Sequence, residues 1–132
     1  MLKDSKAFNG FAVDDLEKAK EFYGETLGVK VTMLDEENGL AELHVHGDQP
    51  TLMYAKPDLK PSNNTILNWQ VGDIDAVVDG LSERGVEFEK YDDENLPQDE
   101  KGVMRGLEQN RGPNIAWFKD PAGNTLSVLQ ES

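Results

Sequence analysis

The chain has 132 residues, of which 37% are apolar and 30% are charged, as is typical of a single water-soluble domain. No apolar run approaches the roughly 20 residues that cross a bilayer, and the N-terminal residues MLKDSKAF hold no apolar signal-peptide core. Acidic residues outnumber basic ones by 26 to 13, which excludes a nucleic acid partner because phosphate binding needs clustered lysine and arginine. Without cysteine there is neither a disulfide framework nor a thiolate metal site, and we expect a cytoplasmic protein with no membrane partner.

The first half of the chain predicts a strand, a helix and three further strands. Residues 6–13 are expected to form the first strand, and Asp14 stands three residues before Glu17, the spacing of a capping box at a helix start. Gly28 is placed to end that helix in a left-handed cap. Strands are predicted over residues 29–34, 40–46 and 51–55, with an acidic hairpin turn between the first two. The apolar stripe of the helix comprises Leu16, Ala19, Phe22, Tyr23 and Leu27.

The second half repeats this pattern. The letters VDDL at residues 13–16 recur as VGDI at residues 71–74, an offset of about 58 residues. Asp73 is predicted to cap a second helix, and strands are predicted over residues 65–70, 86–91, 114–118 and 125–129. We therefore predict one α+β domain over residues 1–132, built from two tandem β-α-β-β-β modules. The modules cover about residues 5–56 and 65–130 and are joined by a polar linker over residues 57–64.

Three segments carry a family resemblance. FAVDDLEKAKEFY at residues 11–23, the pair Leu27-Gly28 and FKDPAGN at residues 118–124 resemble signature segments of the vicinal oxygen chelate superfamily, which includes glyoxalases, bleomycin resistance proteins and extradiol dioxygenases. The resemblance implies a glyoxalase-like fold in which two curved mixed sheets form a cleft, and it implies a homodimer. It does not imply one activity, because this fold hosts isomerases, lyases, dioxygenases and metal-free drug-binding proteins.

The metal positions of that superfamily are filled here by unsuitable side chains. In its metal-dependent members, His, Gln or Glu ligands come from the first and last strand of each module. Counting alternate residues along the strands places Phe8, Ile66 and Ser127 at three of these positions, and the fourth falls within residues 51–54, which include no carboxylate or imidazole. We therefore predict no metal and no other cofactor.

Two histidines leave a metal site as the alternative hypothesis. His44 and His46 stand two residues apart on a predicted strand, so both imidazoles share one face, as in many metal sites. No third ligand is evident, and an exposed or half-buried histidine pair is the simpler expectation.

Residues 92–112 show no clear periodicity, and long segments of this kind act as lids or are disordered. Val103, Met104 and Leu107 need burial and favour an ordered lid over disorder. The candidate lid residues are Gln98, Asp99, Glu100 and Arg105.

The predicted cleft lining mixes apolar walls with a few amides and hydroxyls, a surface suited to a neutral or amphipathic small ligand. The competing expectation is that large side chains fill the space and leave no pocket. Trp69 and Trp117 are expected on the other register, in the core, and residues 120–123 are expected to form a turn. The predicted lining residues are Phe8, Gly10, Tyr54, Ile66, Asn68, Gln70, Thr125 and Ser127.

Three functions remain open from the sequence. The first is metal-free binding of a small molecule in the cleft. The net charge of −13 is compatible with a cation such as the antibiotics that bleomycin resistance proteins sequester, and the simpler explanation of this charge is that it keeps the protein in solution. The second is a metal-dependent lyase, isomerase or dioxygenase with a rearranged site that includes His44 and His46. The third is a scaffold role carried by dimerisation alone.

Overall fold

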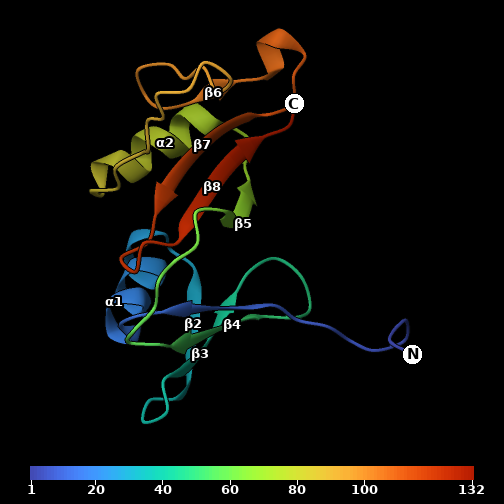
Figure 1. The fold of residues 1–132 in the computed structure, drawn as a ribbon, viewed down its shortest axis with the longest axis vertical. Coiled ribbons are helices and arrows are strands. Elements are labelled where there is room, and N and C mark those ends of the chain that lie inside the picture. Colours follow the sequence, from blue (N-terminus) through green and yellow to red (C-terminus); the bar gives the residue numbers. More distant parts are fainter. The chain divides into compact units, whose positions relative to one another are not determined.

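The computed structural model describes residues 1–132 and divides into two compact units, Met1–Lys60 and Pro61–Ser132. Each unit contains one four-stranded mixed sheet and one α-helix that packs on it (Figure 1). The chain is therefore an α+β protein with a duplicated β-α-β-β-β arrangement. Neither helix combines the length and the apolar character needed to cross a lipid bilayer.

The sheet of the first unit has the strand order β1-β4-β3-β2. Strand β1 runs parallel to β4, whereas β4 with β3 and β3 with β2 are antiparallel. The predicted strand at 51–55 is confirmed, and the first strand is shorter than predicted because it begins at Gly10. The elements are β1 (Gly10–Val13), α1 (Leu16–Glu21), η1 (Phe22–Thr26), β2 (Lys30–Asp35), β3 (Leu40–His44) and β4 (Thr51–Ala55).

Helix α1 begins one residue later than the predicted capping box. Asp15, not Asp14, is the N-cap, and its carboxylate accepts a hydrogen bond from the Lys18 N–H at 3.2 Å. The helix then widens into the π-helix η1, where the Leu27 N–H donates to the Phe22 carbonyl at 2.9 Å. Gly28 follows with a φ of 74°, the left-handed cap that the sequence predicts.

The core of the first unit lies between α1 and one face of its sheet. Tyr23 is fully buried there, and its ring packs edge-on against Phe22 and tilted against Phe11. Leu43 and Met53 from the sheet are also fully buried. The alternation of buried and exposed residues along β3 and β4 follows from this one-sided packing.

The second unit repeats the topology with the order β5-β8-β7-β6. Asp73 caps α2 as predicted, through a hydrogen bond from the Ala76 N–H at 3.1 Å. Phe118, Ile74 and Val78 form its buried core, and Trp69 stacks on Phe118 on the helix side of the sheet, as predicted. The elements are β5 (Thr65–Gln70), α2 (Ile74–Glu83), β6 (Met104–Arg105), η2 (Leu107–Gln109), β7 (Asn114–Lys119) and β8 (Thr125–Gln130).

The predicted strand over residues 86–91 is wrong. Only an isolated bridge joins Phe88 to Phe118, and the edge strand of the sheet is β6, within the segment that showed no periodicity. Val86 is buried and the Phe88 ring packs edge-on against Phe118 at 5.5 Å. The alternating pattern of this segment therefore reflects side-chain burial without a strand ladder.

The turn between β7 and β8 is confirmed. Asp120 is 4% exposed, and its carboxylate accepts hydrogen bonds from the Ala122 N–H at 3.0 Å and the Asn124 N–H at 2.8 Å. These bonds satisfy backbone donors inside the turn, which assigns this carboxylate a structural role.

An ion-pair cluster fastens β6 and the segment before it to α2. Both terminal nitrogens of Arg105 donate to the Asp75 carboxylate, at 2.7 and 2.9 Å, and Arg105 Nε donates to Asp99 at 3.0 Å. Lys101 adds ion pairs to Asp75 at 3.4 Å and to Asp79 at 3.0 Å. The hydrogen bonds from Arg105 lower the pKa of Asp75 to about 2. The second half of this segment is therefore ordered, and its role as a lid stays a prediction.

Replacing Gly39 by alanine should destabilise the protein by about 2–4 kcal/mol. Gly39 has a φ of 71°, and an added Cβ would lie 2.5 Å from the Ala55 Cβ. Gly28→Ala is the matched control, because its φ is 74° but nothing lies within 4 Å of the added Cβ; it should cost about 1 kcal/mol. Urea unfolding measures both values, and equal losses would contradict the assigned clash.

Replacing Arg105 by alanine should lower the free energy of unfolding by about 1–2 kcal/mol, because the carboxylates of Asp75 and Asp99 lose their hydrogen bonds from the guanidinium group. Arg105→Lys should recover little of this loss, since an ammonium group cannot reproduce the two-pronged bond to Asp75. Arg111→Ala, which removes the same charge from an exposed residue, is the control and should be nearly neutral. A full recovery by lysine in urea unfolding would argue against the fork geometry.

The same cluster predicts a pH dependence in acid. The pKa of Asp75 falls from 3.8 to about 2 on folding, so its contribution is complete above pH 3.8 and is lost as the pH falls toward 2. The Asp75 side chain is 47% exposed, and solvent screening limits this contribution to about 1 kcal/mol. The free energies of unfolding of the wild type and of Asp75→Asn, measured across that pH range, should converge as the pH falls. A constant difference would refute the assignment.

Candidate functional site

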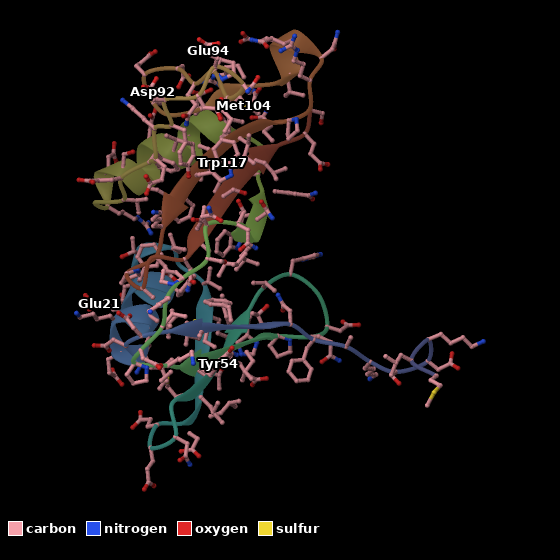
Figure 2. The ribbon with its side chains drawn as sticks, viewed as in Figure 1. Glu21, Tyr54, Asp92, Glu94, Met104 and Trp117 are labelled. Carbon is pink, nitrogen blue, oxygen red and sulfur yellow. The ribbon has the colours of Figure 1, made fainter.

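Each sheet has one face without a helix, called here the helix-free face. In the first unit the strand register places Gly10, Ala12, Leu52 and Tyr54 together on this face, because directly paired residues point to the same side. Glu42 joins them through its pairing with Leu52. Two residues of the predicted cleft lining, Gly10 and Tyr54, therefore share one surface, and Tyr54 is labelled in Figure 2.

A hollow of about 220 Å³ opens on the helix-free face of the first unit. Phe8 and Leu34, both large and exposed at 66% and 52%, stand at its walls. Phe8 reaches it from outside the sheet, because β1 begins only at Gly10 and the strand position predicted for Phe8 is wrong. The residues that line the hollow are Phe8, Leu34, Glu42, Gln49, Pro50 and Leu52.

His44 lies on the same face and His46 does not lie in a strand. His44 ends β3, and its Nε2 and the Thr32 hydroxyl oxygen lie 2.8 Å apart, within hydrogen-bond distance. His46 is exposed in the loop that follows β3. The shared strand face predicted for the two imidazoles is therefore wrong, because the strand ends before His46.

Several polar side chains lie on the helix-free face of the second unit. Asn68 pairs with Ser127 across β5 and β8, and the Ser127 hydroxyl donates a hydrogen bond to the Asn68 side-chain oxygen. Gln70 follows on the same side and donates to Glu131 at 3.2 Å. Thr125 shares this face by alternation along β8, whereas Ile66 sits at a β-bulge and has no direct partner on β8.

Trp117 also lies on this face, which corrects the prediction that it belongs to the core beneath the helix. It pairs directly with Ser127 across β7 and β8, so the two side chains point to the same side. Trp117 is labelled in Figure 2. The Tyr91 ring meets the Trp117 ring edge-on at 5.8 Å. Burial, followed by the nearby charge of Glu89, raises the pKa of Tyr91, so its hydroxyl stays neutral and can donate a hydrogen bond.

Sequence reasoning missed this aromatic pair because Tyr91 and Trp117 are far apart in the chain and tryptophan favours buried positions. The sequence does contain one indication of the face of Trp117, namely the number of residues between Trp117 and Ser127 on the two sides of the turn at residues 120–123. A hairpin closed by that turn fixes which residues of β7 and β8 are opposite one another.

The lid candidates are held by bonds inside the second unit. The Gln98 amide donates to the backbone carbonyls of Glu89 and Gly102, at 2.9 and 2.7 Å, and accepts from the Tyr91 N–H. Burial alone would raise the pKa of Asp99, but hydrogen bonds from the Val103 and Lys101 N–H groups and from Arg105 outweigh it and lower the pKa. Glu100 is exposed. Arg105 points toward α2, on the helix side of the sheet.

In neither unit do three or more His, Asp or Glu side chains converge in a way that could hold a metal ion. Phe8, Ile66 and Ser127, which the resemblance places at the family's ligand positions, offer a ring, an alkyl chain and a hydroxyl already bonded to Asn68. The side chains described here therefore do not fit a resident divalent cation.

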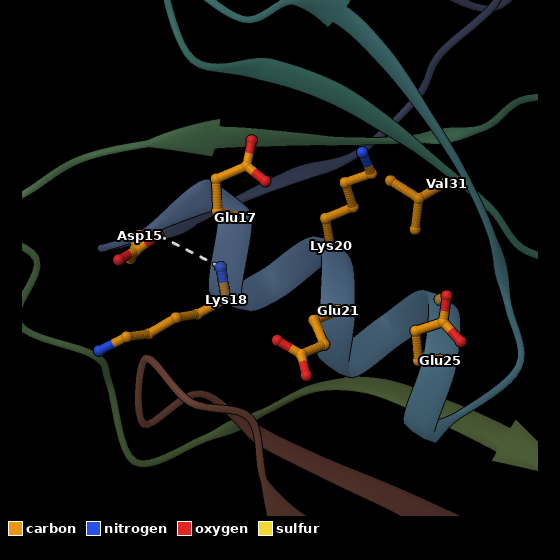
Figure 3. Close-up of a pocket in the computed structure, with 8 residues that line it drawn as sticks. Asp15, Glu17, Lys18, Lys20, Glu21, Glu25 and Val31 are labelled. Carbon is orange, nitrogen blue, oxygen red and sulfur yellow. Dashed lines mark hydrogen bonds between the residues drawn. The ribbon is translucent and has the colours of Figure 1, made fainter.

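A larger, shallower hollow of about 500 Å³ lies over the outer side of α1. Figure 3 shows that its charged side chains point in different directions around the helix and do not converge. The one hydrogen bond drawn there is the N-cap bond from the Lys18 N–H to Asp15. This surface is the solvated face of an amphipathic helix.

Comparison with known proteins agrees with this architecture. The chain is 25% identical over 130 residues to the uncharacterised protein YraH of Bacillus subtilis (strain 168), covering 89% of this chain and 91% of YraH. A superfamily member from Sphaerobacter thermophilus DSM 20745 matches with a TM-score of 0.66 and 26% identity, covering 96% of this chain and 98% of the other.

TnmS3, an antibiotic binding protein from Streptomyces sp. CB03234, matches with a TM-score of 0.66 and 24% identity, covering 98% of both chains. The family model described as Glyoxalase/Bleomycin resistance protein/Dioxygenase superfamily matches residues 9–128. With nearly the whole chain matched and both sheets in the family's topology, the protein belongs to the glyoxalase, bleomycin resistance and dioxygenase superfamily.

Proposed function

We propose that this protein binds a small organic molecule at the helix-free face of a sheet, without a metal and without turnover. The observation that carries the proposal is the chemistry of the helix-free faces. They present exposed aromatic rings and amides, and no three His, Asp or Glu side chains that could hold a metal converge there. The family resemblance places Phe8, Ile66 and Ser127 at the positions that hold a metal in related enzymes.

Each face, taken by itself, offers contacts that suit a small ligand. Exposed rings such as Phe8, Tyr54 and Tyr91 supply apolar area, which contributes about 25 cal/mol for each Å² removed from water. Asn68 and Gln70 are exposed amides that can donate to or accept from a ligand and so fix its orientation. Binding sites for small molecules combine these features, with apolar surface for affinity and a few polar groups for specificity.

The likeness to TnmS3 supports a binding role. It is a likeness of fold, and it shows that this topology is compatible with binding an antibiotic. No three His, Asp or Glu side chains converge to hold a metal on either face, which supports binding over metal-dependent catalysis.

Pairing of two chains and a cytoplasmic setting complete the proposal. Each sheet ends in two strands that lack a neighbour on one side, β1 and β2 in the first unit and β5 and β6 in the second. A second chain can cover such edges, which supports a homodimer. No cysteine is present, so nothing in the chain depends on an oxidising compartment.

Metal analysis separates binding from the metal-dependent alternative. Protein purified without chelator should contain far less than one equivalent of any transition metal by plasma mass spectrometry, because no ligand set converges. A stoichiometric metal would overturn the proposal. Its loss in His44→Ala would then identify a rearranged site that includes His44.

Ligand binding can be followed at Trp117. The chain has two tryptophans, so Trp69→Phe leaves Trp117 as the only one, on the helix-free face. Screening this variant against a library of fragment-sized aromatic compounds should yield ligands that quench or shift its emission. Trp117→Phe, which keeps only Trp69 on the helix side, should respond weakly to the same compounds. A library with no responding compound would count against small-molecule binding.

A further inference from the structure

We propose that the hollow on the first unit is a subsite for an organic ammonium ion, with Glu42 as its counter-ion. The inference rests on the proposed small-molecule binding and adds the charge and shape of the ligand. The apolar part of the ligand packs on Phe8, Leu34 and Leu52, and its ammonium group meets the Glu42 carboxylate.

The walls of the hollow are mostly apolar. Phe8 and Leu34 are large and exposed, and Leu52 and Pro50 complete a concave apolar surface of a size that accommodates one aromatic ring. Exposed apolar groups gathered in a concavity are unusual on a soluble protein and mark sites of contact with a partner or ligand. A packed aromatic ring or short alkyl chain would remove this surface from water.

Glu42 gives the hollow its preference for charge. Its carboxylate forms no hydrogen bond or ion pair in the structure. Lys30 stands on the same face, opposite His44, but no salt bridge joins it to Glu42. A half-buried carboxylate beside apolar walls lacks part of its hydration and is the natural partner of a cation carried on an apolar body.

The charge of the whole chain points the same way. A net charge of −13 draws cations toward the protein and disfavours anions. This field alone does not select a place on the surface. The selection comes from Glu42, which is the one acidic residue among those that line the hollow.

Three probes that differ only in charge test the inference: phenylpropylammonium, the neutral phenylpropanol and the anion phenylpropionate. Each is titrated into nitrogen-15-labelled protein at about 0.15 M salt, where surface charges more than about 8 Å apart are screened. We expect the ammonium to bind about fivefold more tightly than the alcohol, and the anion to bind most weakly. The amide signals of Leu34, Glu42 and Leu52 should shift.

Glu42→Gln should abolish the roughly fivefold preference for the ammonium over the alcohol while leaving affinity for the alcohol nearly unchanged. Glu21→Gln is the matched control. It removes the same charge from the exposed side of the helical segment, across the sheet from the hollow, and should keep the preference. Phe8→Ala should weaken all three probes by about fivefold, since it removes apolar wall shared by all of them.

Several outcomes overturn the inference, and they separate it from the proposed function. Equal affinity for the ammonium and the alcohol, or an unchanged preference in Glu42→Gln, removes the counter-ion role while small-molecule binding stands. Probe shifts confined to the face of Asn68 and Trp117 remove the hollow as the subsite. Shifts at Leu34 and Leu52 that depend on protein concentration without any probe show a second chain covering the hollow. If none of the three probes binds and no library compound changes the fluorescence of Trp117, both proposals are removed.

Discussion

The alternation of side chains along a strand is the constraint on which the rest of this structure depends. Each sheet has one helix to cover it, so every second residue is drawn into a core and the residues between them are left on the other side. In the first unit this rule buries Leu43 and Met53 beneath α1 and leaves Glu42 and Leu52 without cover. The surface available for recognition is thus a by-product of folding, and its chemistry is free to vary while the buried set is held constant.

Duplication gives the protein two such surfaces with different chemistry. The first holds a mostly apolar hollow with one unpaired carboxylate, Glu42, and the second carries Trp117, Tyr91 and the amides of Asn68 and Gln70. Ile66 and Ser127 lie on β5 and β8 and Phe8 precedes β1, so side chains other than metal ligands at these positions leave the scaffold intact. A scaffold of this kind can change from metal chemistry to plain binding without any change in topology.

The sequence predicts the parts of this fold that depend on local patterns. The strands β4 and β5 occur at the predicted residues, and Asp73 caps α2, because alternation and capping act over a few neighbouring residues. The errors involve distant partners. The sequence pattern predicts the wrong face for Trp117, because its pairing with Ser127 depends on the hairpin register. The anchoring of residues 98–105 depends on Arg105 binding Asp75, thirty positions earlier, and no local pattern indicates this contact.

The same anchoring divides the long segment before β6 into parts with different tolerance to change. Gln98 and Arg105 tie its second half to the rest of the unit, whereas the turn that begins at Asp93 is exposed and held only by bonds within itself. Chain closure becomes costlier only slowly as a loop grows. Added peptide at this turn, such as an epitope or a reporter sequence, would therefore leave the sheet undisturbed, making this the natural point at which to graft new material onto the domain.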